Sequence, residues 1–144
     1  MKIVVIILAV IIAIMIGILL FVPAAKSPTV PVSRLAISQD GTITVSVPVM
    51  NAVVASPVMV AGSAKGWYFE AVFPVKILDG DGTVLGSGQA QAHGDWATTS
   101  SVTFSAAISF AAPKYATGTI VFQKDNPSGL PQNDEKFALP VRFK

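Results

Sequence analysis

The sequence predicts an all-β domain, an antiparallel β-sandwich of seven or eight strands, preceded by one transmembrane helix. Three observations carry this prediction. From Thr42 onward, apolar and polar residues alternate in short runs that are separated by turn residues, which is typical of stacked antiparallel sheets. No run with helical periodicity occurs after Val22. The residues before Val22 form one long apolar segment.

The segment Ile3–Val22 is uncharged and long enough to cross a bilayer. About 20 residues, each rising about 1.5 Å, span the ~30 Å hydrocarbon layer. We expect residues 1–22 to be a signal anchor that inserts in the cytoplasmic membrane and leaves the C-terminal domain outside the cytoplasm, in the periplasm or at the cell surface. Cleavage after Ala24 remains an alternative, although the run is longer than a usual signal-peptide core.

Residues 23–41 are predicted to be a linker and residues 42–144 the folded domain. Pro23, Pro28 and Pro31 disfavour regular structure in the linker, because proline lacks an amide donor and has a fixed φ. The chain has no cysteine, so the domain is held by its hydrophobic core rather than by disulfides. The formal net charge of +2 is too small and too scattered to indicate a nucleic-acid surface.

The domain contains seven alternating runs that we interpret as strands. The longest run begins at Trp67 and places Phe73, Val75 and Ile77 on one face, together with Phe69 and Ala71. Pro74 predicts a bulge or an unpaired edge within it. The runs are Ile43–Val47, Val58–Gly62, Trp67–Leu78, Thr83–Ala92, Val102–Phe110, Gly118–Lys124 and Phe137–Phe143.

Several details of these strands lead to further expectations. The Asp79–Gly82 stretch, D-G-D-G, predicts a tight hairpin turn. Thr83–Ala92 is diluted by glycine, so we expect it at a sheet edge. Glu70 lies on the polar face of its run, and Arg142 is a candidate partner for its carboxylate. Short strands of this number over about 100 residues fit an immunoglobulin-like sandwich.

Several stretches of the domain, taken in order, match the pattern of a known family. They are Val54–Ala64, Trp67–Ala71, Asp79–Gly82, Gly94–Trp96, Phe104, Asp125–Pro131 and Leu139–Phe143. From about Ile43 to Phe143 the chain thus resembles the immunoglobulin-like domain family of bacterial spore-germination proteins. This resemblance implies a small β-sandwich, often joined to a membrane anchor or to other exported domains, and no established enzymatic activity.

The residues that could carry chemistry favour structural interpretations. His93 is the only histidine and has no G-x-S-x-G nucleophile motif to serve, so a hydrolase is disfavoured. Asp79–Gly82 resembles the start of a calcium loop, but Ala90 stands where the loop needs its glutamate. We therefore expect no enzymatic activity, no cofactor and no metal.

A low-charge domain of this kind is expected to act through its surface. The candidate binding surface combines large aromatic side chains with a long turn, and it comprises Trp67, Tyr68, Trp96, Asn126, Pro127, Ser128 and Leu130. The alternative for the aromatic residues is that they cap the core. The first functional hypothesis is a non-enzymatic protein-interaction or structural module of the bacterial cell envelope, tethered by Ile3–Val22 to an unknown envelope partner. The alternative is a cell-wall glycan-binding module that uses Trp67 and Trp96.

Overall fold

The computed structural model describes residues 35–144 of the chain. The predicted anchor, residues 1–22, and residues 23–34 of the predicted linker lie outside the described residues. Among residues 35–144, no helix is long and apolar enough to cross a membrane. Residues 35–144 comprise the predicted domain and the last part of the predicted linker.

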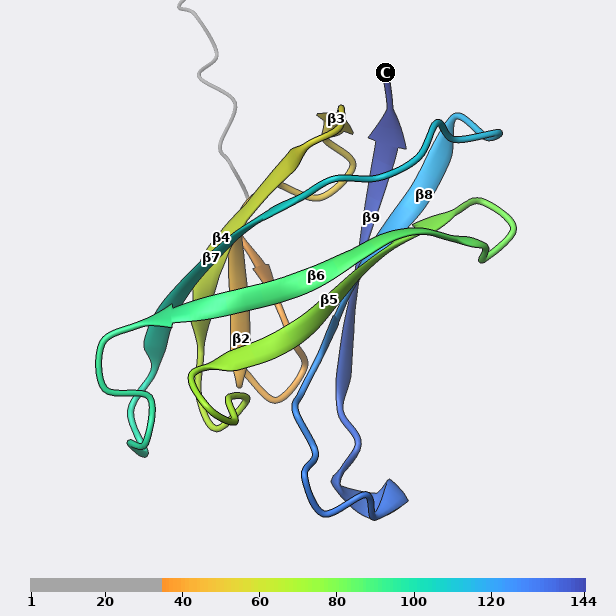
Figure 1. The fold of residues 1–144 in the computed structure, drawn as a ribbon. Helices are drawn as coiled ribbons and strands as arrows, with labels where there is room; N and C mark the ends of the chain where they lie inside the picture. Colours follow the sequence, from red (N-terminus) through yellow and green to blue (C-terminus); the bar gives the residue numbers. More distant parts are fainter. Residues whose placement is uncertain (1–34) are drawn as a thin grey trace, which may run out of the picture. The chain divides into compact units, whose positions relative to one another are not determined.

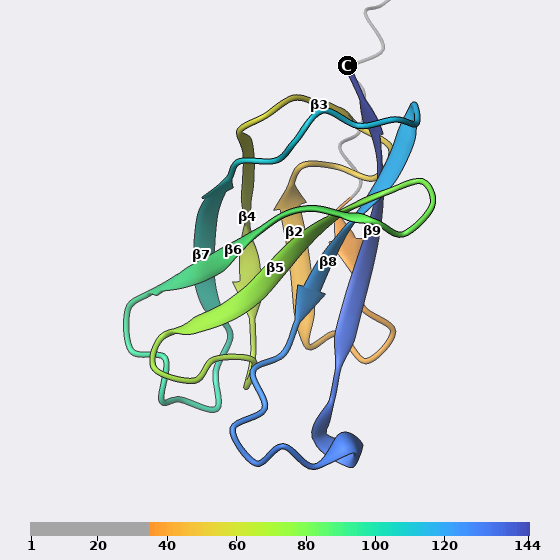
Figure 2. The ribbon, with the colours of Figure 1, turned by 45° about the vertical axis from the view of Figure 1, so that its right-hand side comes forward.

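The described residues form nine strands in one hydrogen-bonded sheet, with the strand order β1-β2-β4-β7-β6-β5-β8-β9-β3 (Figure 1). The sheet curls so that its two halves face each other, as the rotated view shows (Figure 2). A short 3-10 turn, η1 (Pro131–Asn133), precedes the last long strand. The strands are β1 (Ala36–Ile37), β2 (Ile43–Val47), β3 (Val53–Val54), β4 (Val58–Ala64), β5 (Val72–Asp79), β6 (Val84–His93), β7 (Val102–Ile108), β8 (Thr117–Gln123) and β9 (Lys136–Phe143).

The all-β class is confirmed, and two details of the predicted sandwich are corrected. There are nine strands rather than seven or eight, because two-residue strands add to each edge of the sheet. The two layers are also one continuous sheet, since β6 pairs with β5 along its length and with β7 through Gln91–His93. One pair, β3 with β9, is parallel. Strand β1 lies within the stretch that the sequence predicts as linker.

The core lies between the two halves of the curled sheet. Each half contributes every second side chain, which is the period that a pleated strand imposes. Phe73, Phe104 and Phe122 lie at its centre, and their rings contact one another with centroids 4.9 and 6.0 Å apart. Burying each such side chain contributes about 1.5–3 kcal/mol, so the core alone can hold a cysteine-free domain.

The long run from Trp67 divides into a loop and a strand, which corrects the prediction of one strand over Trp67–Leu78. Strand β5 begins only at Val72, because Glu70 and Ala71 adopt positive φ values of 51° and 66° that an extended strand excludes. Phe73, Val75 and Ile77 are buried as predicted, whereas Phe69 is 41% exposed.

Pro74 of β5, which has no backbone N–H, lies where β5 is paired with β6 but not yet with β8. Pro74 pairs with Gln89 of β6, and pairing of β5 with β8 begins one residue later, at Val75. The expected unpaired edge at Pro74 is therefore confirmed. The bulge in the β5–β6 pair lies elsewhere, where Leu85 of β6 is the extra residue opposite Ile77 and Leu78.

The glycines of β6 reflect close packing rather than an edge position, which corrects that prediction. A Cβ on Gly88 would lie 2.5 Å from Cδ1 of Ile108, and one on Gly86 would lie 2.3 Å from the carbonyl oxygen of Ser109. Strand β6 is interior in the strand order. Its glycines make room for β7 and the following segment to cross over it.

The connections gather at two ends of the domain (Figures 1 and 2). We call one the loop end, formed by residues 38–42, 65–71, 94–101 and 124–135. The opposite end is called the hairpin end, formed by residues 48–57, 80–83 and 109–116. The strand directions place every predicted binding residue at the loop end.

Candidate functional site

Trp67 lies in the β4–β5 connection and is fully buried. Its ring packs edge-on against Phe73 with centroids 5.7 Å apart. Its Nε1 donates a hydrogen bond of 3.0 Å to Oγ1 of Thr42, and its carbonyl oxygen accepts one from the amide of Asp125. Trp67 therefore caps the core, in agreement with the alternative interpretation, and offers no surface to a partner.

Thr42 and Glu135 extend this contact into a polar network at the loop end. The Thr42 hydroxyl accepts from Trp67 and lies 2.7 Å from Oε1 of Glu135, to which it can donate its one proton. The other carboxylate oxygen of Glu135 pairs with Nζ of Lys124 at 3.2 Å. The network joins the β1–β2, β4–β5 and β8–β9 connections, so it fixes the positions of these three loops relative to one another.

Tyr68 is half-buried and also anchored. Its hydroxyl donates a hydrogen bond of 2.6 Å to the carbonyl oxygen of Val102, and its ring lies 5.3 Å from that of Phe73. Burial raises the pKa of Tyr68 to about 12. Trp96, in the β6–β7 connection, is partly exposed. Of the three aromatic residues predicted at the surface, Trp67 is buried, and Tyr68 and Trp96 are partly exposed.

The β8–β9 connection is an ordered loop that presents the remaining predicted residues. Nδ2 of Asn126 donates to the carbonyl oxygen of Leu130 at 2.9 Å and to Oδ1 of Asp134 at 2.8 Å. The Ser128 hydroxyl accepts from Nδ2 of Asn133 at 2.9 Å. Pro127 is exposed and the Leu130 side chain is 49% exposed. This loop is therefore a preformed, exposed surface with an apolar tip.

A polar hollow of about 420 Å³ lies at the loop end. Two cations, Lys65 and Lys124, contribute to its lining, and the β6–β7 connection contributes Thr98 and Thr99, close in sequence to Trp96. Asp40 on its rim accepts hydrogen bonds from the Ser38 hydroxyl at 2.6 Å and from the Thr42 amide, which lower the pKa of its carboxyl group well below the usual range. Hydroxyls and opposite charges together suit a polar, hydroxylated ligand.

The hairpin end is organised by Asp79, which is 4% exposed. Its carboxylate accepts hydrogen bonds from the amides of Gly80 and Lys114, both at 2.8 Å, and from the amide of Tyr115 at 3.3 Å. The predicted turn is confirmed, since the Asp79 amide donates to the carbonyl oxygen of Thr83. The same residue therefore closes the hairpin and fixes the segment 109–116.

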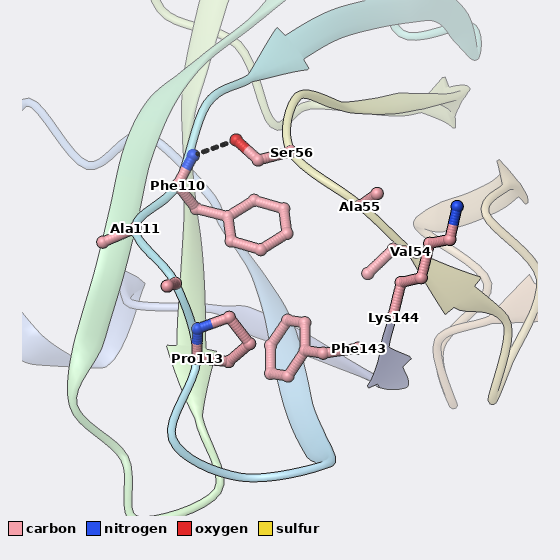
Figure 3. Close-up of a pocket in the computed structure, with 9 residues that line it drawn as sticks. Val54, Ala55, Ser56, Phe110, Ala111, Pro113, Phe143 and Lys144 are labelled. Atoms are coloured by element: carbon pink, nitrogen blue, oxygen red, sulfur yellow. Dashed lines mark hydrogen bonds between the residues drawn. The ribbon is translucent and has the colours of Figure 1, made fainter.

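An apolar hollow of about 380 Å³ lies beside this segment (Figure 3). Phe110 and Phe143 face each other there, with ring centroids 5.5 Å apart. The Ser56 hydroxyl accepts a hydrogen bond of 2.9 Å from the Phe110 amide and ties the β3–β4 connection to the wall. The hollow is therefore bounded by the β3–β4 connection, the β7–β8 connection and the end of β9.

Two charged or polar residues that the sequence singled out have structural roles. Nε2 of His93 lies 2.7 Å from the Ser105 hydroxyl, across neighbouring strands. The proposed Glu70–Arg142 pair does not form, because Glu70 lies in the exposed loop before β5. Nε of Arg142 donates instead to the carbonyl oxygen of Asn51. Within residues 35–144 the ion pair is Lys124–Glu135.

Sequence reasoning missed Thr42, Glu135 and the residues of the polar hollow. Thr42 and Glu135 are 93 positions apart, and no periodicity or motif relates them. The only local signal is the pair Lys124 and Glu135 at opposite ends of the same turn. Their contact depends on how the curled sheet brings its first and last connections together.

The curled all-β sheet and its two loop-bearing ends define an immunoglobulin-like domain. A family model described as the immunoglobulin-like domain of bacterial spore germination matches residues 42–130, more than half of the chain. The chain belongs to this family. The match ends before β9, although Leu139 and Val141 of that strand are buried in the core. No curated protein and no solved structure matches the chain.

Proposed function

We propose that this chain is a non-enzymatic protein-interaction or structural module of a bacterial cell envelope. In this proposal Ile3–Val22 anchors the chain in the cytoplasmic membrane and the immunoglobulin-like domain lies outside the cytoplasm. The length and apolar character of the first segment support the anchor. Membership of the germination domain family supports a modular, non-catalytic role.

One observation carries the proposal: Trp67, Tyr68 and Asp79, three residues that could carry recognition or chemistry, hold the fold instead. Trp67 and Tyr68 bond to Thr42 and Val102, and Asp79 accepts three backbone amides. What the domain presents to partners is then its surface. A tether raises the local concentration of such a surface near the membrane, so a modest interface is sufficient.

Photocrosslinking in cells tests this proposal. A photoreactive amino acid at Leu130, which is 49% exposed at the loop end, is expected to capture a specific envelope protein. The matched control is Val84, which is 55% exposed next to the opposite turn. Equal and unspecific labelling from both positions contradicts the interaction role. A C-terminal reporter active only in the cytoplasm contradicts the topology.

A second candidate function is binding of cell-wall glycan, favoured by the polar hollow that lies near Trp96 in sequence. Trp67 is buried and cannot contact a glycan, so Trp96 is the aromatic platform for this candidate function. Sugar rings stack on partly exposed aromatic faces. Retention of the full-length protein on purified peptidoglycan that is lost in Trp96→Ala and kept in Val84→Ala would favour this candidate over the first.

A further inference from the structure

The outer face of one half of the sheet carries no charged side chain. Strands β2, β4 and β7 alternate between buried and solvent-facing residues, and β1 extends the same face. Among the described residues of this face there is no Asp, Glu, Lys or Arg. The outward residues are Leu35, Ile37, Thr44, Ser46, Val47, Met59, Ala61, Ser63, Thr103, Ser105 and Ala107.

The rest of the described surface differs in charge. The outer face of β5, β8 and β9 presents Lys76, Lys136 and Arg142. The loop end and the hairpin end each carry both acidic and basic residues. A charged partner placed on the β1-β2-β4-β7 face would lose its hydration without gaining an ionic contact. A partner that binds this face is therefore expected to have an uncharged contact surface of similar size.

The face is also uneven in a regular way. Large apolar side chains stand on its β1 and β2 side, where Leu35, Ile37 and Val47 are 54%, 56% and 47% exposed. Small side chains line its β7 side, where Ala61 pairs with Ser105 and Ser63 with Thr103. The ring of His93 from β6 bounds this side, since its Nε2 lies 2.7 Å from the Ser105 hydroxyl. The face thus has an apolar ridge beside a strip of small side chains, which we call the trough.

We propose that this face binds the same face of a second copy of the chain. A twofold axis parallel to the strands and lying between β2 and β4 places the ridge of each copy on the trough of the other. Two sheets packed in this way keep their strands nearly aligned, and a twofold contact is the commonest form of self-association. The described residues of this face include no Asp, Glu, Lys or Arg, so a second copy of the face satisfies the charge requirement.

The size of the face sets the strength of the contact. Strands β1, β2, β4 and β7 have 2, 5, 7 and 7 residues. With about 3.3 Å per residue and about 4.8 Å between strands, they cover about 330 Å². Each copy then contributes less than half of the ~800 Å² per partner in a standard stable interface. The self-association is therefore weak, and the local concentration of the anchored chain makes it effective. Covalent trapping detects such a contact.

This inference rests on the proposed interaction role and names one partner for it. Because the chain has no cysteine, single-cysteine variants of the full-length protein report one position each. Met59 is 56% exposed on β4, next to the proposed axis. We expect Met59→Cys to form a disulfide-linked dimer when cell membranes are oxidised, and Lys76→Cys on the opposite face to form at least about tenfold less.

A charge placed at the centre of the face provides the second test. In the Met59→Cys background, Ala61→Asp is expected to reduce dimer trapping at least about tenfold, because two like charges meet across the axis. Mixing the Ala61→Asp and Ala61→Lys chains is expected to restore trapping, which a misfolded variant could not do. Ala138→Asp, exposed on the opposite face, is the control that leaves trapping unchanged.

Equal trapping from Met59→Cys and Lys76→Cys overturns the proposal, and so does crosslinking of Met59→Cys only to a protein of another mass. The photocrosslinking experiment at Leu130 tests the loop end, whereas cysteine trapping at Met59 tests the sheet face. Either experiment can therefore fail while the other succeeds. Specific capture at Leu130 without trapping at Met59 refutes the dimer and keeps the interaction role.

Discussion

The loop end and the hairpin end hold their connections by different means. At the loop end a chain of side chains, from Trp67 through Thr42 and Glu135 to Lys124, joins three connections. At the hairpin end one buried carboxylate, that of Asp79, accepts backbone amides directly. The first arrangement depends on the identity of four side chains, whereas the second depends on one.

This difference indicates which end is suited to variation. Every residue type except proline has the same backbone amide, so the contacts with Asp79 place no other demand on the side chains of Lys114 and Tyr115. At the loop end a change of one side chain leaves its partner unpaired in a partly buried place, which has a cost of its own. The loop end is therefore the more constrained of the two. It is also the end that presents the preformed Asn126–Leu130 surface.

The largest expected effect sharpens the contrast between the two tryptophans of the loop end. Trp67→Ala removes a fully buried ring and is expected to lower the free energy of unfolding by about 3–5 kcal/mol. Trp96→Ala removes a partly exposed ring and is expected to lower it by about 1 kcal/mol or less. Denaturant unfolding followed by circular dichroism measures both. Similar losses from the two variants would show that Trp96 is also a core residue.

The hairpin end is tested through Asp79. Asp79→Asn keeps the shape but removes the charge from the buried acceptor, and we expect a loss of about 2–3 kcal/mol in the free energy of unfolding. The matched control is Asp81→Asn in the same turn, where the carboxylate is exposed and accepts the Thr83 amide. Its loss is expected to be about 1 kcal/mol or less. Equal losses would refute the central role of Asp79.

Alkaline pH tests the anchoring of Tyr68 at the loop end. Its folded-state pKa is raised from 10.0 to about 12 by burial, so the folded state favours the neutral phenol. This contribution to stability is fully present below about pH 10 and is lost as the pH rises from 10 through 12. Thermal unfolding across this pH range is expected to show the loss in the native chain and a smaller one in Tyr68→Phe. An identical pH dependence of the two would contradict the assignment.

The smallest expected effect comes from Asp40 on the rim of the polar hollow. Hydrogen bonds from Ser38 and Thr42 hold the pKa of the Asp40 carboxyl group below its ordinary value of 3.8. Its contribution to stability is therefore present above about pH 4 and decreases as the pH falls further, because the unfolded state takes up the proton first. Asp40→Asn is expected to flatten the acid limb of the stability curve slightly. An unchanged acid limb would show that the exposed turn contributes nothing.

The sequence predicts those strands in which apolar and polar residues alternate clearly enough to show which side chains face the core. Ile43–Val47 matches β2, and the cores of β4, β7, β8 and β9 lie where the alternation placed them. The Asp79–Gly82 turn followed from the backbone freedom of glycine. The two-residue strands β1 and β3 could not be found, because two residues carry no period.

The candidate site was predicted only in part, for a physical reason that Trp67 illustrates. The sequence around a large aromatic residue next to a strand does not show whether its ring faces the core or the solvent. The positive φ values of Glu70 and Ala71 turn the chain between Trp67 and β5. With this turn, the Trp67 ring packs against Phe73 and its Nε1 donates to Thr42. The loop Asn126–Leu130 was predicted as an exposed turn because it is rich in Asn, Pro, Ser and Gly, which favour turns over strands and helices.

The sequence by itself determined the fold class, the positions of most strands and the reliance on a hydrophobic core, because these follow from alternation over neighbouring residues. The tertiary structure decided which aromatic residues are buried, how the sheet closes through β6 and β7, and where the uncharged face lies. These depend on contacts between residues far apart in the chain, such as Thr42 with Glu135, and no local pattern encodes such a contact.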